Sequence, residues 1–226
     1  MTRDQKRADR VEVSELRSLS TPANADGSFG DGTFNTPPLV EAADTGPFFH
    51  TDVTISGASA HNTSSATTIE QAVAFYDSPA FNNSPIGLLA PIDLDATQIN
   101  NIGRFLRGVN AIFNIQMTSK RALGARTLGN VFGNLHLSTQ QTLLSLAREE
   151  LDDAIAVLSG AQGGPLNATD LTRLQQARTS LTTAISTSNL AARQQAISDA
   201  HNKLDLADTG ISANINFTIG DGTLMF

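Results

Sequence analysis

Tyrosine and histidine are the side chains of this chain best suited to metal or acid–base chemistry. The sequence holds one tyrosine, Tyr76, and four histidines, of which His50 follows two phenylalanines. A tyrosine oxygen is an anionic donor that stabilises ferric iron, and an imidazole can hydrogen-bond, shuttle protons or bind a metal ion. The absence of cysteine excludes disulfides, thiolate catalysis and thiolate metal sites. Tyr76 and His50 are therefore the first candidates for a site, while the residues of any catalytic step stay unassigned.

Each candidate also has a purely structural interpretation. A histidine after two phenylalanines, as at His50, is more often a packed core residue, and a metal pair of His50 with His61 lacks any recognised ligand spacing. Tyr76 is expected to close the apolar face of a short helix, with its hydroxyl hydrogen-bonded at the rim. His136 and His201 stand alone in helical sequence and are interpreted as surface or helix-end residues. Ligation and packing both stay open for Tyr76 and His50.

The segment that positions the tyrosine is predicted to be a helix that begins at Thr68. Thr68 and Gln71 can form a capping box, in which each side chain accepts a hydrogen bond from the other residue's backbone amide. The apolar face has the helical spacing i, i+3, i+4, i+7 and consists of Ile69, Ala72, Val73 and Tyr76. Upstream, Pro37-Pro38 favours an extended chain, and Gly46-Pro47 bends the chain just before His50.

The order of these segments resembles the C-terminal segment of bacterial di-haem cytochrome c peroxidases and their MauG-like relatives. FNTPPLVEAADTGPFFH, residues 34–50, is similar to the family's F-x-T-P-x-L pattern that ends in P-Y-F-H-D-G, and TTIEQAVAFY, residues 67–76, is similar to its T-L-E-E-A-V helix. The resemblance covers roughly residues 30–112 and includes FLRGVN, residues 105–110, where the family reads F-L-x-x-L-N. Two departures are Thr51-Asp52 in place of Asp-Gly and an insertion at 51–67, whose role the sequence does not indicate.

The resemblance implies a set of cofactor-binding residues. Tyr76 aligns with the axial haem ligand, which makes it the metal-binding residue, and Pro47, Phe49 and His50 align with the haem surroundings. The implied cofactor is haem c, but its covalent attachment needs Cys-x-x-Cys-His and this chain has no cysteine. The chain thus resembles part of a haem protein without the part that anchors the haem.

The implied function is that of the C-terminal portion of a di-haem cytochrome c peroxidase-like protein, which supplies an axial ligand and covers one haem face. In that family one haem reacts with peroxide and a second relays electrons. Peroxide reduction is therefore expected only when this portion is joined to the haem-bearing part, and whether the chain is an enzyme by itself stays open. The implied partners are a haem-bearing N-terminal part or protein and an electron-donor protein, and the implied location is the periplasm.

Two alternatives remain beside that function. The first is a non-catalytic helical scaffold or interaction protein, and the second is a helical surface protein whose motif match is accidental. The N-terminus as written lacks the apolar region of a signal peptide. This fits either a truncated or split reading frame or a short protein in its own right. A chain without half of its haem pocket would expose apolar surface, so we also expect a tendency to associate.

Composition excludes some classes of partner. Twenty-two acidic and fifteen basic residues give a net charge of −7 and a pI near 4.9, which disfavours nucleic acid because phosphate binding needs a positive surface field. No apolar run approaches the roughly 20 residues that span a bilayer. The acidic clusters at 149–153 and 205–208 are interpreted as solvated helix faces.

The predicted fold is mainly α. We expect an N-terminal arm at 1–20, a cytochrome c peroxidase-like C-terminal segment at 21–120, a helical bundle at 121–208, and an extended tail or hairpin at 209–226. The bundle is expected to be a three- to four-helix up-down bundle, with short β-hairpin pieces elsewhere. Helices are predicted at about 97–123, from Ser138 to Gly160, from Asn167 or Thr169 onward, and at about 189–205. Alternating apolar residues before Asp221-Gly222 predict a hairpin over 211–226.

Overall fold

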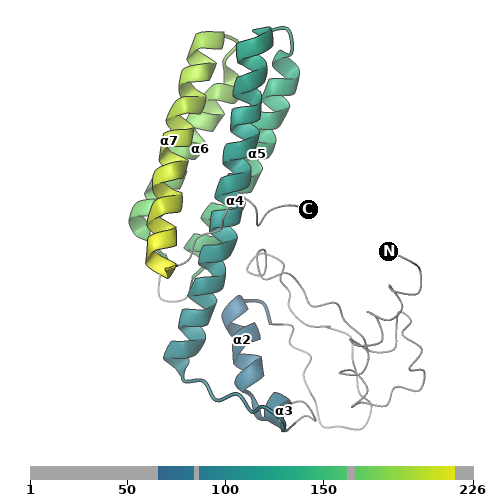
Figure 1. Ribbon diagram of the computed structural model, residues 1–226, viewed down its shortest axis with the longest axis vertical. Coiled ribbons are helices and arrows are strands. Elements are labelled where there is room, and N and C mark those ends of the chain that lie inside the picture. Colours follow the sequence, from purple (N-terminus) through teal and green to yellow (C-terminus); the bar gives the residue numbers. More distant parts are fainter. Residues whose placement is uncertain (1–65, 84–86, 162–165, 217–226) are drawn as a thin grey trace, which may run out of the picture.

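The computed structural model describes residues 66–83, 87–161 and 166–216, and these residues are mainly helical (Figure 1). Their helices are α2 (Ile69–Asp77), α3 (Pro79–Asn82), α4 (Ala96–Phe132), α5 (Leu137–Ser159), α6 (Ala168–Ser186) and α7 (Leu190–Ile215). The mainly α prediction is therefore confirmed for this part of the chain. The expected arm, the residues up to 65, the candidates Pro47, Phe49 and His50, and residues 217–226 lie outside the described residues.

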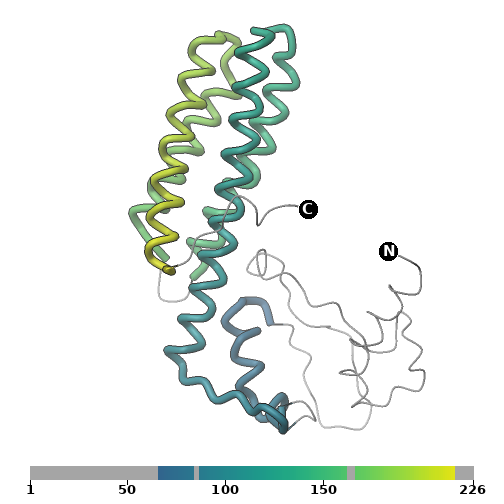
Figure 2. Tube along the Cα trace, in the orientation of Figure 1, coloured from purple at the N-terminus to yellow at the C-terminus, as the bar shows by residue number. Residues whose placement is uncertain are grey.

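The four long helices pack in chain order, and the last closes on the first. α4 packs against α5, α5 against α6, α6 against α7, and α7 against α4, so that the four lie side by side as a rod (Figure 2). We call the end that carries the α4–α5 and α6–α7 connections, residues 131–137 and 186–190, the tip. The opposite end, where α2 packs on α4 and α3 packs on α2, is called the α2 end.

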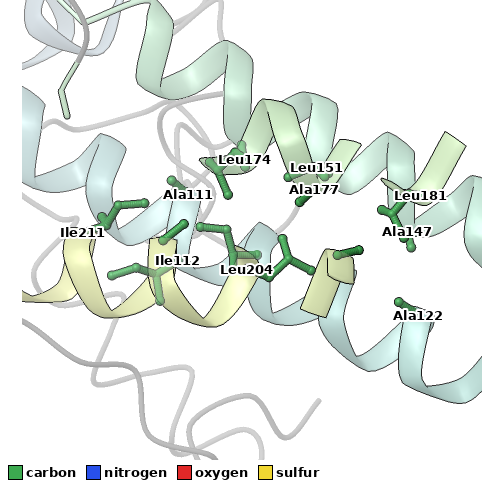
Figure 3. Packing of buried hydrophobic residues seen from close by; sticks show 14 of the residues in the cluster. Ala111, Ile112, Ala122, Ala147, Leu151, Leu174, Ala177, Leu181, Leu204 and Ile211 are labelled. Carbon is green, nitrogen blue, oxygen red and sulfur yellow. The ribbon is translucent and has the colours of Figure 1, made fainter. Parts of the chain in front are cut away.

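A repeat of seven residues builds the core of this rod. Leu144, Leu151 and Leu158 on α5 are seven residues apart and fully buried, as are Ile197, Leu204 and Ile211 on α7. Three residues after each of these leucines or isoleucines, except the last, stands a buried alanine: Ala147, Ala154, Ala161, Ala200 and Ala207. A seven-residue repeat keeps one stripe of a slightly supercoiled helix facing its neighbours. The alternation of large and small side chains lets the helices interdigitate closely (Figure 3).

Helix α4 is longer than the predicted helix at about 97–123. It begins at the N-cap Asp95, whose side chain accepts from the Gln98 amide, and it continues to Phe132 before Gly133 takes a positive φ of 58°. The sequence at 124–132 contains two glycines, which argues against a helix by propensity alone. Gly129 is nevertheless buried against α7, and a Cβ there would lie 2.1 Å from the Gln194 Nε2 atom. The close contact between α4 and α7, rather than the local helix propensity, therefore explains why α4 continues past residue 123.

Three predicted helix ends are confirmed and one predicted start is wrong. Asn167 and Asn189 are the N-caps of α6 and α7, and Gly160 ends α5. The helix start predicted at Ser138 is wrong by one residue, because α5 begins at Leu137 with His136 at the N-cap and no side-chain cap. The preceding turn, which is fixed by tertiary hydrogen bonds described below, sets this start.

Helix α7 also corrects the predicted hairpin. Residues 211–215 were expected to be extended, but they form the last turns of α7, which ends at Asn216 in the left-handed conformation (φ 52°, ψ 43°). Ile211 lies seven residues after Leu204 and is fully buried, and Ile215 packs at Gly108 of α4. The helical conformation therefore buries Ile211 fully and Ile215 partly. The expected boundaries after residues 120 and 208 fall inside the continuous helices α4 and α7.

The described helices include none that is long and apolar enough to cross a membrane.

Candidate functional site

Helix α2 forms around the predicted capping box and carries Tyr76 in its last turn. The Thr68 hydroxyl accepts from the Gln71 amide at 3.2 Å, and the Gln71 side chain accepts from the Thr68 amide at 3.3 Å. Ile69 and Ala72 of the predicted apolar face are buried, and Val73 is half-buried. Tyr76, expected to close that face, is 44% exposed.

Tyr76 belongs to a cluster of three aromatic rings at the junction of α2 and α3. Its ring centroid lies 5.1 Å from that of Phe81 and 5.7 Å from that of Phe75, and both pairs are edge-to-face. Aromatic pairs at these distances and angles attract each other through their quadrupoles. The cluster therefore fixes the direction of the tyrosine ring while its surface stays open to solvent.

Two polar contacts hold the turn that carries this cluster. Asn82 pairs with the backbone of Ile92, with its Oδ1 atom accepting from the Ile92 amide at 2.8 Å and its Nδ2 atom donating to the Ile92 carbonyl at 2.6 Å. Asp77 accepts from the Leu94 amide at 2.8 Å. Because these contacts span ten and seventeen residues, they tie α2 and α3 to the segment that leads into α4.

A buried ion pair anchors α2 on the rod. Arg107 Nε lies 2.8 Å from Glu70 Oε1 and Arg107 Nη2 lies 2.9 Å from Glu70 Oε2, so the guanidinium and carboxylate meet as a bidentate fork. Arg107 also donates to the Val157 carbonyl of α5 at 3.3 Å. Gly103 makes room for this fork, since a Cβ at Gly103 would lie 2.6 Å from Glu70 Cγ. Glu70 of α2 is therefore tied to α4, and through Arg107 to α5.

The fork holds Glu70 in its charged form. Burial by itself raises the pKa of the Glu70 carboxyl, but the hydrogen bonds from Arg107 and from the Glu70 backbone, together with the charge of Arg107, lower that pKa below its ordinary value. A charged Glu70 keeps the fork intact at neutral pH. The anchor of α2 is thus electrostatic.

Exposed apolar side chains gather at the same end of the molecule. Besides Phe75 and Tyr76, the exposed large residues there are Leu88, Leu89, Ile102 and Phe105. The last two lie near Gly103 on α4, and each is 37% exposed. We call these six residues the α2-end surface. Exposed apolar side chains gathered at one end of a molecule can mark a binding site.

The described residues contain no complete haem site. Tyr76 offers one oxygen ligand, and the α2-end surface offers apolar contact. The chain has no cysteine, so it cannot attach haem c covalently. Within the described residues, no group of three or more His, Cys, Asp or Glu side chains could hold a metal ion. Any haem would therefore need most of its ligands and its anchor from residues that lie elsewhere.

A second polar arrangement, which the sequence analysis did not single out, lies between α4 and α7. Ser119 Oγ is 2.9 Å from His201 Nδ1, and Asp205 Oδ1 is 3.5 Å from the same nitrogen. A hydrolytic triad needs the serine and the carboxylate on opposite nitrogens of the imidazole. Since both approach Nδ1, this arrangement cannot relay a proton from serine to aspartate. His136, by contrast, lies exposed at the N-cap of α5, as the sequence predicted.

The second arrangement borders an open groove of about 220 Å³. The groove is lined by Ile115, Gln116, Ser119, Lys120, Asp205 and Asp208. Burial raises the pKa of the Asp208 carboxyl, and the nearby charge of Asp205 adds to this, although hydrogen bonds from Gln116 and Ser212 partly offset it. The spacing of His201, Asp205 and Asp208 along one face of a helix is the signal that could have found this groove in the sequence.

No protein-family model, curated protein or solved structure matches the chain in comparisons with known proteins.

Proposed function

We propose that this chain acts as the C-terminal portion of a di-haem cytochrome c peroxidase-like protein of the periplasm. In this proposal α2 presents Tyr76 as an axial ligand, and the α2-end surface covers one face of a haem carried by another part or protein. The observation that carries the proposal is the placement of Tyr76. Its ring is exposed, oriented by Phe75 and Phe81, and mounted on a helix that a buried ion pair anchors.

The chemistry of these residues supports the proposal. A tyrosine oxygen is a hard, anionic donor that favours ferric iron, as in tyrosine-ligated haem proteins. Apolar side chains beside a ligand exclude water and lower the local dielectric, which strengthens the electrostatic effect of that ligand. Haem, when bound, supplies the redox chemistry. This chain contributes the oxygen donor, the apolar contact and the fixed position of both.

The architecture suggests what the rest of the chain does. We propose that residues 21–120 contain the cytochrome c-like segment and that α4–α7 form an up-down bundle that supports it. Arg107 joins these two parts, since it contacts Glu70 of α2 and the Val157 carbonyl of α5. A rigid support would hold the ligand within the small tolerance that a functional site requires.

A second candidate is a non-catalytic helical scaffold that binds a partner protein through the α2-end surface. The observation that favours it is the distribution of buried residues, most of which belong to α4–α7 and face one another. Under this alternative, Tyr76 contributes an aromatic contact at an interface and its hydroxyl has no role toward iron.

A haem titration separates the two candidates. Ferric haem would be added to the purified chain and followed by visible absorption, with Tyr76→Phe beside the wild type. This variant removes one oxygen and keeps the ring. The matched control combines Tyr76→Phe with Phe132→Tyr, which moves the tyrosine to a site of nearly equal exposure, 47% against 44%, at the other end of the molecule.

Ligation by Tyr76 predicts a shifted Soret band and a high-spin ferric band in the wild type. Both bands should be lost in Tyr76→Phe, and the relocated tyrosine should not restore them. Equal binding by all three proteins would contradict ligation by Tyr76. Absence of haem binding by the wild type, together with capture of a haem-bearing partner that Tyr76→Phe also captures, would favour the scaffold.

A further inference from the structure

The tip of the rod displays a second group of exposed apolar side chains, far from the α2 end. Val131 and Leu135 are 65% and 77% exposed, and Phe132 between them is 47% exposed. All three stand on the last turn of α4 and the turn that follows it (Figure 1). Placing large apolar side chains in water is unfavourable, and packing in the core does not account for these three residues.

The tip is a fixed shape. Arg193 is fully buried beneath it, donating to Gln140 Oε1 at 3.0 Å, to the Thr187 carbonyl at 3.1 Å and to Asn134 Oδ1. Asn134 in turn donates to the Ser188 carbonyl at 3.0 Å, which links the two connections of the tip. The apolar side chains are therefore presented on a braced turn, and little conformational entropy is lost when they contact a partner.

The charge of the tip half of the rod is opposite to that of the whole chain. The chain carries a net charge of −7, yet residues 96–148 and 171–198 contain no aspartate or glutamate. Five arginines lie in the tip half: Arg121, Arg126, Arg148, Arg178 and Arg193. Arg121 and Arg178 pair with Glu150 and Asp152, whereas Arg126 and Arg148 form no ion pair with the described residues. The apolar side chains of the tip are therefore carried by a half of the rod in which Arg126 and Arg148 have no carboxylate partner among the described residues.

This combination fits a lipid surface better than a second copy of the chain. A stable protein interface buries about 1,200–2,000 Å² and involves roughly 20 residues on each side, which three side chains cannot provide. Insertion into a bilayer needs only a small apolar group, and anionic headgroups attract nearby arginines. Arg126 lies five residues before Val131 in α4, which places it roughly 7 Å back along the helix axis. That spacing matches the depth of about 5–10 Å to which interfacial helices insert.

We propose that the tip is a site for reversible insertion into the surface of an anionic lipid bilayer. Val131, Phe132 and Leu135 enter the boundary between headgroups and acyl chains, and Arg126 stays at the level of the headgroups. The rod then stands on the membrane with its α2 end directed away. This role is independent of any haem chemistry at Tyr76.

A tryptophan reporter tests the insertion directly. The chain contains no tryptophan, so Leu135→Trp gives a single fluorophore at the tip, and Leu89→Trp gives a matched one at the α2 end. Each protein would be mixed with vesicles of phosphatidylglycerol or of phosphatidylcholine. We expect a blue shift for the tip reporter alone, with partitioning about tenfold stronger into phosphatidylglycerol because of the nearby arginine charge.

Vesicle co-sedimentation of serine variants gives the second readout. Val131→Ser combined with Leu135→Ser should abolish binding, while Leu88→Ser combined with Leu89→Ser, at positions 68% and 77% exposed, should keep it. Thermal unfolding of each variant checks that the rod is intact. Binding that survives in the tip variant, or absence of binding by the wild type, would overturn the proposal. So would a blue shift without vesicles that grows with protein concentration, because it would assign the tip to contact between protein chains.

Discussion

The two ends of the rod each contain a buried arginine beside exposed apolar side chains, but the two guanidinium groups have different hydrogen-bond partners. Arg107 at the α2 end meets the carboxylate of Glu70 in a bidentate fork. Arg193 at the tip donates to three neutral oxygens, those of Gln140, Thr187 and Asn134, and burial lowers the pKa of its guanidinium. One end is held by an ion pair and the other by a network of amide and carbonyl acceptors.

This difference predicts different stabilities. The α2 end attaches one short helix to the rod through a single fork and a few apolar contacts, so it can detach while the rod stays folded. The tip network joins the connections between helices that already share the core, so it opens only when those helices separate. Local unfolding of a protein occurs most readily in the elements with the fewest buried contacts. The candidate ligand Tyr76 thus stands on the part of the molecule whose attachment is easiest to change.

Removal of one partner of the fork should give the largest effect. Glu70→Gln leaves the Arg107 charge buried without its counter-charge, which typically costs about 3–5 kcal/mol. We expect α2 to lose its attachment, so that its amides exchange rapidly with deuterium while those of α5–α7 stay protected. Equal loss of protection along the whole rod would contradict separate attachment of α2.

Removal of the tip arginine should have a slightly smaller effect that extends over the rod. Arg193→Met keeps the volume of the side-chain stem but leaves the buried Gln140 Oε1 without its donor. It also removes the hydrogen bonds to the half-buried Thr187 carbonyl and to the exposed Asn134, at a total cost of roughly 3 kcal/mol. The measurement is the free energy of unfolding in urea. We expect one cooperative transition at lower urea, with α2 exchange changed no more than that of the helices. Faster amide exchange in α2 alone would contradict the expectation that Arg193 stabilises the rod as a whole.

A methyl group in the notch of α4 should weaken the α2 end without changing any charge. Gly103→Ala places a Cβ 2.6 Å from Glu70 Cγ, and overpacking of this kind costs about 1–3 kcal/mol. Faster amide exchange confined to α2 is the expected result. The matched control is Gly124→Ala, where a Cβ would meet only Leu143 Cδ1 at 4.0 Å, so its exchange should be unchanged or slower.

Acid should loosen the α2 end before the tip. The folded pKa of Glu70 is lowered, so its contribution to stability is complete above the unfolded pKa, about 4.3, and is lost as the pH falls through the lower folded value. The hydrogen bonds of Arg193 at the tip involve no carboxylate and should not change in this pH range.

Asp208 behaves oppositely to Glu70, because its raised pKa makes the ionised form unfavourable in the fold. Asp208→Asn should therefore raise the stability at pH 7, measured by thermal unfolding, while leaving the acid response of α2 intact.

The smallest effect is expected at a partly exposed ion pair between α5 and α6. Arg178 Nε and Asp152 Oδ1 lie 2.5 Å apart between α6 and α5, and the two side chains are 54% and 38% exposed. Exposed pairs contribute about 0–1 kcal/mol, so Asp152→Asn should shift the urea midpoint little. A loss comparable to that of Glu70→Gln would mean that burial does not distinguish these pairs.

Local features of the sequence decided where several helices begin and end. These features act on backbone groups within four residues of themselves, so their effect can be predicted without knowledge of the fold. They are the capping box of Thr68 and Gln71, the N-caps Asn167 and Asn189, and Gly160. The seven-residue repeat of leucine and isoleucine is equally local, and it determined that the described part of the chain is mainly helical. The aromatic and histidine motifs, likewise, were enough to select Tyr76 as a candidate.

Tertiary structure alone decided the features that depend on residues far apart in the chain. Glu70 and Arg107 are 37 residues apart, and nothing in either neighbourhood predicts their pairing. Gly129 continues a helix because α7 packs against it, and Ile211 is helical because the core accepts it one repeat after Leu204. The exposure of Tyr76 and of the tip has the same cause. A side chain's burial depends on which surfaces meet in space, and those surfaces come from residues far apart in the chain, which no short stretch of sequence contains.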